Sequence, residues 1–430
     1  MVRIAPFVLL FLPLFAQADE KWLWSTAHVV PKETTSEGSG YFSIIEGKNG
    51  VIYVGSAKYH HNAYLVGFDP KSQQMKIAVD CMQEIGSTAT GFAAQAKIHT
   101  RNNIGPSGKI YFGTKQGYPA KGQPVTDYPG GYPMVYNPAT GKTKVYDIPI
   151  KHHGIISVTP DESRNLAYIS TCDDGRPIEH AHFMVLDLAT GKYTDLLDSE
   201  HMYAFIVVDH QGRAYHPLRG GEIARYNPDT KKLDKLKQTI DGQQPSKESH
   251  LVDEHSHPLN WDISPDGKTL WCVAMSGNRL FSYDLTGDGD TLAGKSHGPL
   301  IKDAADTDCR AMCVAADGRI WAGVNATEFV SLNDPKKPEA KKKETFLHLT
   351  SYKPGDDAVK DHGRVAIKNP DYTNFTDAAG KQLPWHHGVY KHESGVTLPR
   401  YSCLGVCAGS DGTVYLLSLA PFTLHAIKPE

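Results

Sequence analysis

The 430-residue chain lacks any strong excess of charge: 45 Lys and Arg residues stand against 48 Asp and Glu residues, a formal net charge of −3. Its longest run of basic residues is Lys341–Lys343. Proteins that bind nucleic acids do so mainly through clustered cations that neutralise phosphates. The composition therefore argues against a nucleic acid as a partner.

Long apolar runs are absent after the N-terminus. The first residues, MVRIAPFVLLFLPLFAQADE, contain Arg3, an apolar run from Phe7 to Phe15 and the small-residue motif Ala16-Gln17-Ala18. This order is typical of a secretory signal peptide, and the run is shorter than the ~20 apolar residues of a membrane anchor. We therefore expect cleavage after Ala18, so that residues 1–18 are removed and residues 19–430 form a single exported domain, secreted or periplasmic, with no membrane span.

Cysteine is scarce as well. The seven positions are Cys81, Cys172, Cys272, Cys309, Cys313, Cys403 and Cys407. An odd number in an exported chain leaves at least one thiol outside any disulfide. The count is also too low for a scaffold held together by disulfides, so a hydrophobic core must stabilise the fold.

What the sequence does contain is a repeat. Its clearest copy, Lys151–Leu197, has four β-rich segments separated by Gly, Asp and Asn turns. The predicted strands are Gly154–Val158, Leu166–Ser170, Phe183–Asp187 and Lys192–Leu197. The motif around the first turn recurs in copies that begin at Tyr41, Ala96, His152, Met202, His257, Cys309 and Cys403. A four-stranded unit repeated every ~40–50 residues is typical of a β-propeller blade, so the sequence predicts an all-β, seven-bladed propeller.

The sequence departs from the repeat at both ends of the chain. The last copy has only three strands, whereas a strand-like segment, Lys21–Val30, precedes the first copy. A propeller must protect the strand edges where its two ends meet. We therefore expect the N-terminal strand to complete the last blade and close the ring, and residues 352–400 to form a long insertion on the top face before that blade.

The phasing of the repeat places the start of each innermost strand at the top end of the central channel. The residues predicted there are Tyr41, His99, His153, Tyr203, Pro258, Cys309 and Cys403. Irregular loops open on the same face, where functional residues usually lie. They add His60, His61, His152, His180, His182, His201, His216, His255, His257 and Arg219.

A candidate catalytic group combines His153, Tyr203 and Arg219, with His61 across the mouth. His and Tyr transfer protons when their pKa values are tuned, and Arg binds a carboxylate through two parallel hydrogen bonds. The set suits removal of a proton next to a carboxylate, because the cation stabilises the developing enolate. This β-elimination is how a lyase cleaves a uronic-acid polysaccharide; a mouth that only binds its ligand is the alternative.

Further residues are candidates for holding the substrate. They are His60, His99, His152, His201, Arg364, Trp385 and His386. The last three belong to the expected insertion, whose aromatic and His side chains suit a lid over a saccharide; a structural flap is the alternative.

A second group suggests a metal. Cys309 and Cys403 occupy matching heights on adjacent inner strands, and His257 and His255 lie at the top of the preceding one. Thiolates and imidazoles are the ligands of structural zinc, so we predict a zinc site that fastens the ring. A Cys309–Cys403 disulfide and buried thiols are the alternatives. Cys313 and Cys407, four residues further along each strand, are expected to point the same way but deeper, within the core.

Together, the signal peptide, the seven repeats, the His/Tyr/Arg group and the Cys/His group resemble the seven-bladed propeller polysaccharide lyases, most closely the ulvan lyases. Those enzymes cleave bonds between rhamnose sulfate and glucuronate or iduronate by β-elimination, and some hold a structural zinc. The resemblance implies that His153 takes the role of the inner-strand His, Tyr203 that of the tyrosine, and Arg219 that of the group neutralising the uronate. The loop 114–133 lacks the further His of that family, so His60 or His61 would have to replace it.

The resemblance leaves other functions open. Oligogalacturonate lyases share the propeller but use a His-rich catalytic manganese site. From a different class, a non-catalytic propeller would bind a glycan or a protein on its top face. In the main interpretation, the partner is an acidic polysaccharide and the protein is a monomer.

Overall fold

The computed structural model describes residues 22–36, 42–175, 179–200, 205–244, 259–274, 277–332, 335–337, 339–369, 389–399, 404–419 and 422–429. Within these ranges the chain is all-β, with strands β1 to β31 and only short helices. The helices are α1 (Cys81–Ile85) and the 3-10 turns η1 (Lys32–Thr34), η2 (Gly91–Ala93) and η3 (Val125–Asp127). No helix in the described residues is long and apolar enough to cross a membrane.

Most of the strands are short, and they follow one another closely. The first part of the chain forms β1 (Trp22–Val29), β2 (Ile44–Glu46), β3 (Ile52–Gly55), β4 (Tyr64–Asp69), β5 (Gln74–Asp80), β6 (Lys97–Ile98), β7 (Asn103–Ile104), β8 (Ile110–Lys115), β9 (Pro133–Asn137), β10 (Lys142–Val145), β11 (Gly154–Asp161), β12 (Leu166–Cys172), β13 (His180–Asp187) and β14 (Tyr193–Glu200). The four strands predicted in the clearest repeat are thus present as β11 to β14; the first three are extended by two or three residues, and β14 begins one residue later and ends three residues later than predicted.

The second part of the chain continues the pattern. It forms β15 (Val207–Val208), β16 (Ala214–Pro217), β17 (Ile223–Asn227), β18 (Lys232–Ile240), β19 (Leu259–Ile263), β20 (Thr269–Ala274), β21 (Arg279–Asp284), β22 (Thr291–Pro299), β23 (Asp306–Val314), β24 (Ile320–Ser331), β25 (Lys341–Tyr352), β26 (Lys360–Ile367), β27 (Val389–Lys391), β28 (Thr397–Pro399), β29 (Gly405–Ala408), β30 (Val414–Ser418) and β31 (Thr423–Ile427).

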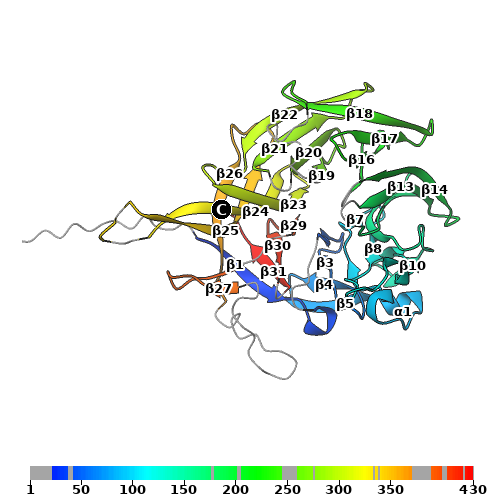
Figure 1. Ribbon diagram of the computed structural model, residues 1–430, viewed down its shortest axis with the longest axis horizontal. Helices are drawn as coiled ribbons and strands as arrows, with labels where there is room; N and C mark the ends of the chain where they lie inside the picture. Colours follow the sequence, from blue (N-terminus) through cyan, green and yellow to red (C-terminus); the bar gives the residue numbers. More distant parts are fainter. Residues whose placement is uncertain are drawn as a thin grey trace, which may run out of the picture.

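Strands that are consecutive in the sequence pair antiparallel within groups, such as β2 to β5 and β11 to β14. Parallel pairing of β18 with β22 and of β1 with β26 joins neighbouring groups at their outer strands. Figure 1 shows the groups arranged around the middle of the molecule, with short strands such as β7, β19 and β29 innermost. The fold is therefore all-β and propeller-like.

The first turn of every repeat copy has the same backbone feature, a residue with positive φ. These residues are Gly50 (75°), Gly108 (83°), Asn165 (56°), Gly212 (81°), Gly267 (69°), Gly318 (80°) and Gly412 (80°). Left-handed φ costs little for Gly and is tolerated by Asn, whose short side chain bonds locally. The recurrence of these two residue types in the sequence is thus explained by one shared turn conformation.

The hydrophobic core lies between consecutive groups of strands. Tyr111 and Val135 of β8 and β9, for example, pack against Ile155, Ile169 and Met184 of β11 to β13. The inner strands are therefore covered on both faces, which explains their nearly continuous apolar sequences. A further cluster packs the first strands against the last ones; it includes Ile44, Val54, Tyr415, Leu417 and Leu424.

The N-terminal strand joins the end of the chain, as expected from the sequence. Residues Ser25 to Val29 of β1 pair antiparallel with β31. The hydroxyl of buried Ser25 donates to the carbonyl of Ala366 at 2.9 Å and lies 3.2 Å from Nδ1 of His425. His425 Nε2 in turn lies 2.8 Å from the Ser418 hydroxyl. Hydrogen bonds thus connect β1 to β26, β30 and β31.

The expected insertion at 352–400 is wrong for residues 360–367. They form β26, which pairs antiparallel with β25 and parallel with β1, and the hairpin β27–β28 attaches to it. The sequence did not predict this strand because it carries charged side chains, which are unusual inside a sheet. The structure pairs one of them, Arg364, with Glu328 at 2.5 Å. Residues 370–388 lie outside the described part of the chain.

Candidate functional site

Loops from three consecutive groups of strands meet at one end of β8 and β11. The ring of Tyr59, before β4, lies 5.3 Å from the ring of Tyr118, after β8. The carbonyl of Tyr128, in the same loop as Tyr118, lies 2.6 Å from Nδ1 of His152, before β11. These contacts bring together the loops that the sequence placed on one face.

His153 immediately precedes β11 and is half-buried at this junction. Its Nδ1 lies 3.1 Å from the Thr171 hydroxyl, and its ring centroid lies 5.2 Å from that of His182. Burial, together with the nearby His182, lowers the pKa of His153 to about 4. The imidazole is therefore neutral at neutral pH, and when Nδ1–H donates to Thr171, Nε2 is free to accept a proton.

Arg219 reaches the same edge from the next group of strands. Its Nη1 lies 3.0 Å from a carboxylate oxygen of Glu200. Glu200 is paired with His180 at the ends of β14 and β13, two residues from His182. His182 in turn contacts His153. The Arg219 guanidinium therefore lies at the same end of the sheet as His153. Arg219 is exposed, so an anionic ligand in solution has access to it.

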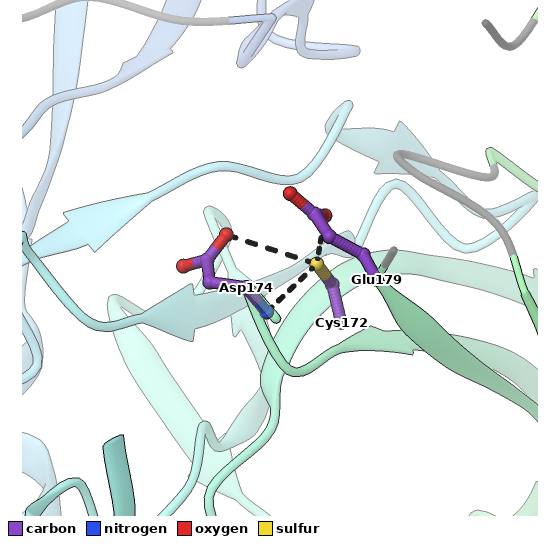
Figure 2. Close-up of side chains that lie close together, drawn as sticks. All are labelled: Cys172, Asp174 and Glu179. Carbon is purple, nitrogen blue, oxygen red and sulfur yellow. Dashed lines mark hydrogen bonds between the residues drawn. The ribbon is translucent and has the colours of Figure 1, made fainter. Parts of the chain in front are cut away.

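Beside His153 lies a buried group that we term the Lys–Cys cluster. Its members are Lys97, Lys115, Cys172, Asp174 and Glu179. Lys115 Nζ lies 2.5 Å from Asp174, and the Cys172 thiol donates to Glu179 at 2.7 Å. Figure 2 shows the sulfur between the two carboxylates, with the Asp174 oxygen at 3.8 Å. The two lysines are only 2% and 0% exposed.

The electrostatics of the Lys–Cys cluster follow from its burial. Burial, with the charge of Lys115 beside it, lowers the pKa of Lys97 to about 7, although Asp174 opposes this. Burial and the two carboxylates raise the pKa of Cys172 well above its usual value, so the side chain is a thiol. The cluster thus places two lysines and two acidic residues around a neutral thiol, and the pKa of Lys97 is lowered into the neutral range.

Part of the Lys–Cys cluster has the composition of a metal site. The ligand atoms of Cys172, Asp174 and Glu179 all lie within 4.8 Å of one another, and thiolate and carboxylate are zinc ligands. However, the adjacent Lys97 and Lys115 repel a divalent cation. The three residues could hold a metal only if Cys172 and Lys97 each lost a proton.

The other predicted residues in this region have different environments. His60 and His61 are exposed in the loop between β3 and β4, and His60 has a positive φ of 66°. His99, predicted to bind substrate, is buried and packs against the ring of Phe42 at 5.5 Å. Burial and the charges of the two lysines hold its pKa well below its usual value. His99 is therefore a neutral interior residue and not a surface contact for a polysaccharide.

Arg364 belongs to a different network, held within the sheet. Besides its ion pair with Glu328, its guanidinium lies 4.1 Å from the ring centroid of Phe346. His348 bridges the carboxylates of Glu328 and Asp361 at 2.6 and 3.1 Å. The structure does not join Arg364 to the His153 region. The predicted residues that lie outside the described part of the chain are Tyr41, His201, Tyr203, His255, His257, Pro258, Trp385, His386 and Cys403.

The predicted zinc ligand Cys309 is buried in β23. It lies in a cluster with Trp271, Leu280 and Met312. Cys313, expected to point the same way, lies instead in the cluster of Trp321 and Val406. The pairing of β23 shifts between Asp308 and Ala311, and such a bulge reverses the alternation of side chains. The expected common orientation is therefore wrong, while the zinc site itself stays a prediction because its other three residues are not described.

Sequence reasoning missed the two lysines. Lys115 ends the apolar strand IYFGTK and Lys97 stands in AKIHT. A lysine at a strand end usually points to solvent, so neither position indicated burial. The available signal was Cys172-Asp173-Asp174, a thiol and two carboxylates directly after the second strand of the clearest repeat.

No family model and no curated protein matches this chain. A chain in a solved structure described as "Crystal Structure of Mitotic Checkpoint Complex" is similar to it, with a TM-score of 0.51 and 7% sequence identity. The match covers 100% of this chain and 99% of that chain. At this identity the similarity concerns the fold alone, over the whole length of the chain.

Proposed function

We propose that this protein is an exported polysaccharide lyase that cleaves a uronic-acid-containing polysaccharide of the ulvan type by β-elimination. The observation that carries the proposal is the state of His153: an imidazole with a pKa of about 4, positioned by Thr171 at an accessible junction of loops. A base that is neutral at working pH is the first requirement of this reaction. The second requirement is a cation for the substrate carboxylate, which exposed Arg219 supplies.

The proposed step is a β-elimination at the uronate. His153 Nε2 takes the proton from C5 of the uronate, next to its carboxylate, while Arg219 binds that carboxylate. The electron pair of the C5–H bond forms the C4–C5 double bond, and the C4–O glycosidic bond breaks. The departing oxygen takes a proton from an acid, for which we propose Tyr203. The products are an unsaturated uronate and a free hydroxyl group.

The Lys–Cys cluster supports this chemistry from behind His153. The charge of Lys115 contributes to the low pKa of His153, so the buried ammonium helps to keep the base neutral. Lys115 is fully buried and paired with Asp174, so we assign it to the environment of the base and not to substrate contact.

We also propose that the strands form seven blades of four, with β1 as the fourth strand of the last blade. Seven left-handed first turns and the packing of β2 to β4 against β29 to β31 support this number. A structural zinc at Cys309, Cys403, His257 and His255 is part of the same proposal. Cys309 contributes a buried sulfur at the start of an inner strand.

The decisive experiment measures ultraviolet absorbance during incubation with ulvan, glucuronan, alginate and pectate, because β-elimination creates an absorbing unsaturated uronate. We expect the signal with ulvan, and a loss of at least ~10²-fold in His153→Ala. His210→Ala is the matched control, since His210 is an exposed residue of a turn and its Nδ1 lies 3.3 Å from the Gly267 carbonyl. Silence of the wild type on all four polymers would favour the binding-only propeller, and full activity of His153→Ala would refute the assigned base.

A further inference from the structure

His152, the residue directly before the proposed base, has a backbone conformation that its residue type disfavours. Its φ is 68°, in the left-handed region that favours glycine. The backbone N–H of His153 donates to the carbonyl of Ile150 at 3.4 Å, which closes a turn with His152 at its third position. A positive φ at this position is characteristic of a type II turn, where Gly or Asn is the usual residue. A histidine in this place therefore needs a structural explanation.

The imidazole of His152 supplies that explanation through a hydrogen bond to the preceding loop. Its Nδ1 lies 2.6 Å from the carbonyl oxygen of Tyr128, and its backbone N–H donates to the next carbonyl of that loop at 3.2 Å. A carbonyl only accepts hydrogen bonds, so Nδ1 carries the proton. The carbonyl of His153 in turn accepts the N–H of Gly131 at 2.8 Å. Residues 128–131, which we term the strap, thus bind both histidines.

The strap is itself anchored in the interior of the protein. Tyr128 is fully buried, and its hydroxyl donates to Oε1 of buried Gln95 at 2.6 Å. Gln95 Nε2 donates in return to the carbonyl of Gly130 at 2.8 Å. A Cβ added to Gly131 would collide with the carbonyl oxygen of Thr114 in β8, so the strap lies directly against that strand. The strap is therefore a fixed support for the turn at His152.

The backbone of His153 is held by the strap, and its side chain contacts the neighbouring strands. Nδ1 of His153 lies 3.1 Å from the Thr171 hydroxyl of β12, and its ring centroid lies 5.2 Å from that of His182 on β13. Rotation about φ of His152 would turn the Cα–Cβ bond of His153 and move the ring away from these partners. Reacting atoms must lie about 3–3.5 Å apart, and a shift of about 1 Å can cost about 10²-fold in rate. The turn at His152 therefore determines the position of the proposed base.

We propose that His152 is a positioning residue: its Nδ1–H holds the left-handed turn against the strap and so orients His153. This role differs from the substrate contact that the sequence suggested for His152. A glycine would allow the same turn, but it could not bond to the strap. The assignment rests on the proposed function and deepens it, because it concerns the proposed base, yet the bond can be tested without any polysaccharide.

The test compares three substitutions by NMR titration of His153 in protein with ring-labelled histidine. His152→Asn keeps an N–H donor near the place of Nδ1 and tolerates positive φ, so we expect the pKa of His153 to stay at about 4. His152→Gly keeps the turn but loses the donor, and His152→Ala loses the donor and also disfavours the turn. We expect both to raise the pKa of His153 to about 5 or above, because a displaced ring loses its burial.

Lys231→Ala is the matched control for a change at a left-handed residue. Lys231 also has a positive φ, 57°, but it is exposed in the turn between β17 and β18. We therefore expect the pKa of His153 to be the same in this variant as in the wild type. Equal unfolding temperatures for all variants would exclude misfolding as the cause of a changed pKa.

Activity separates the positioning role from the proposed reaction. If the wild type cleaves ulvan, we expect His152→Ala to lower kcat about 10- to 10²-fold with little change in KM, and His152→Asn to retain most of the activity. A changed pKa of His153 in a protein that cleaves no polymer would refute the lyase and keep the positioning role. A raised KM with unchanged kcat, an Asn variant as impaired as the Ala variant, or an unchanged pKa in both the Gly and the Ala variants would overturn the positioning role.

Discussion

Arg101 and Asp262 form an ion pair, with 2.5 Å between Nη2 and Oδ2, that links the turn between β6 and β7 to β19. Arg101 also donates to the carbonyl of Trp261, and the same Asp262 oxygen accepts the backbone N–H of Val314 at 2.7 Å. Arg101 lines a small cavity together with side chains that come from distant parts of the sequence, including Phe42 and Phe205. One carboxylate thus ties three groups of strands together at the middle of the molecule.

Removing that carboxylate charge should destabilise the fold. We expect Asp262→Asn to lower the free energy of unfolding by about 1–3 kcal/mol, below the 3–5 kcal/mol of a fully buried pair, because the two side chains keep 17% and 21% exposure. Urea denaturation followed by circular dichroism measures the change. Arg310→Met is the control, since exposed Arg310 pairs with Asp308, two residues away, and we expect no measurable effect there. Equal losses in both variants would contradict a special role for the pair.

The low pKa of His153 sets the pH dependence of the proposed reaction. The base must be neutral, so the acid limb of the pH profile should reflect its pKa. We expect kcat/KM to fall as the pH drops through about 4, and protonation of His153 to have no effect on it above about pH 6. The His182 ring contributes to this low pKa, so His182→Gln should move the limb to higher pH. The measurement is the pH profile of the absorbance assay. His210→Gln should leave the limb in place, and an unmoved limb in His182→Gln would contradict the assigned coupling.

The sequence allowed prediction of the features that depend on local chemistry. Gly and Asn at the first turns indicate a positive φ. Each turn requires this conformation whatever the rest of the fold, so it can be predicted locally. The N-terminal strand was predicted from a missing partner, and it pairs with β31. His153 was placed at the start of an inner strand by the phasing of the repeat, and it lies directly before β11.

The features that the sequence hid depend on contacts between distant residues. Lys115 is buried because Asp174, in the next group of strands, supplies a countercharge. Arg364 lies within a sheet because Glu328 supplies one there. The bulge between Asp308 and Ala311 reversed the orientation expected for Cys313. None of these three effects has a signature within the few residues around it.

The metal content of the protein distinguishes two possible sites. We expect about one zinc per chain, lost in Cys309→Ser and kept in Cys172→Ser, because Lys97 and Lys115 repel a divalent cation from Cys172. Elemental analysis of protein purified without chelator measures the content. Cys272→Ser is the control, as Cys272 is a buried cysteine in an apolar cluster. Loss of zinc in Cys172→Ser alone would move the site to the Lys–Cys cluster, and absence of zinc from the wild type would leave Cys309 as a buried thiol.

His425 couples the attachment of the N-terminal strand to pH. Burial lowers its pKa from 6.5 to about 3, so the ring is neutral while it bridges Ser25 of β1 and Ser418 of β30. Between these two pH values the unfolded chain binds a proton that the folded protein does not, so stability is full above pH 6.5 and falls as the pH drops. His425 alone should contribute a slope of about 1.4 kcal/mol per pH unit.

We therefore expect His425→Gln to lower the free energy of unfolding at pH 7 by about 1–3 kcal/mol, through loss of its hydrogen bonds, and to reduce the slope between pH 6 and pH 4 by about 1.4 kcal/mol per unit. Urea denaturation at several pH values measures both quantities. His210→Gln, an exposed substitution, should change neither. The substitution removes the proton that His425 takes up on unfolding. If the variant kept the slope of the wild type, the pKa of His425 would not be lowered in the folded protein, and a neutral His425 would not hold β1 in place.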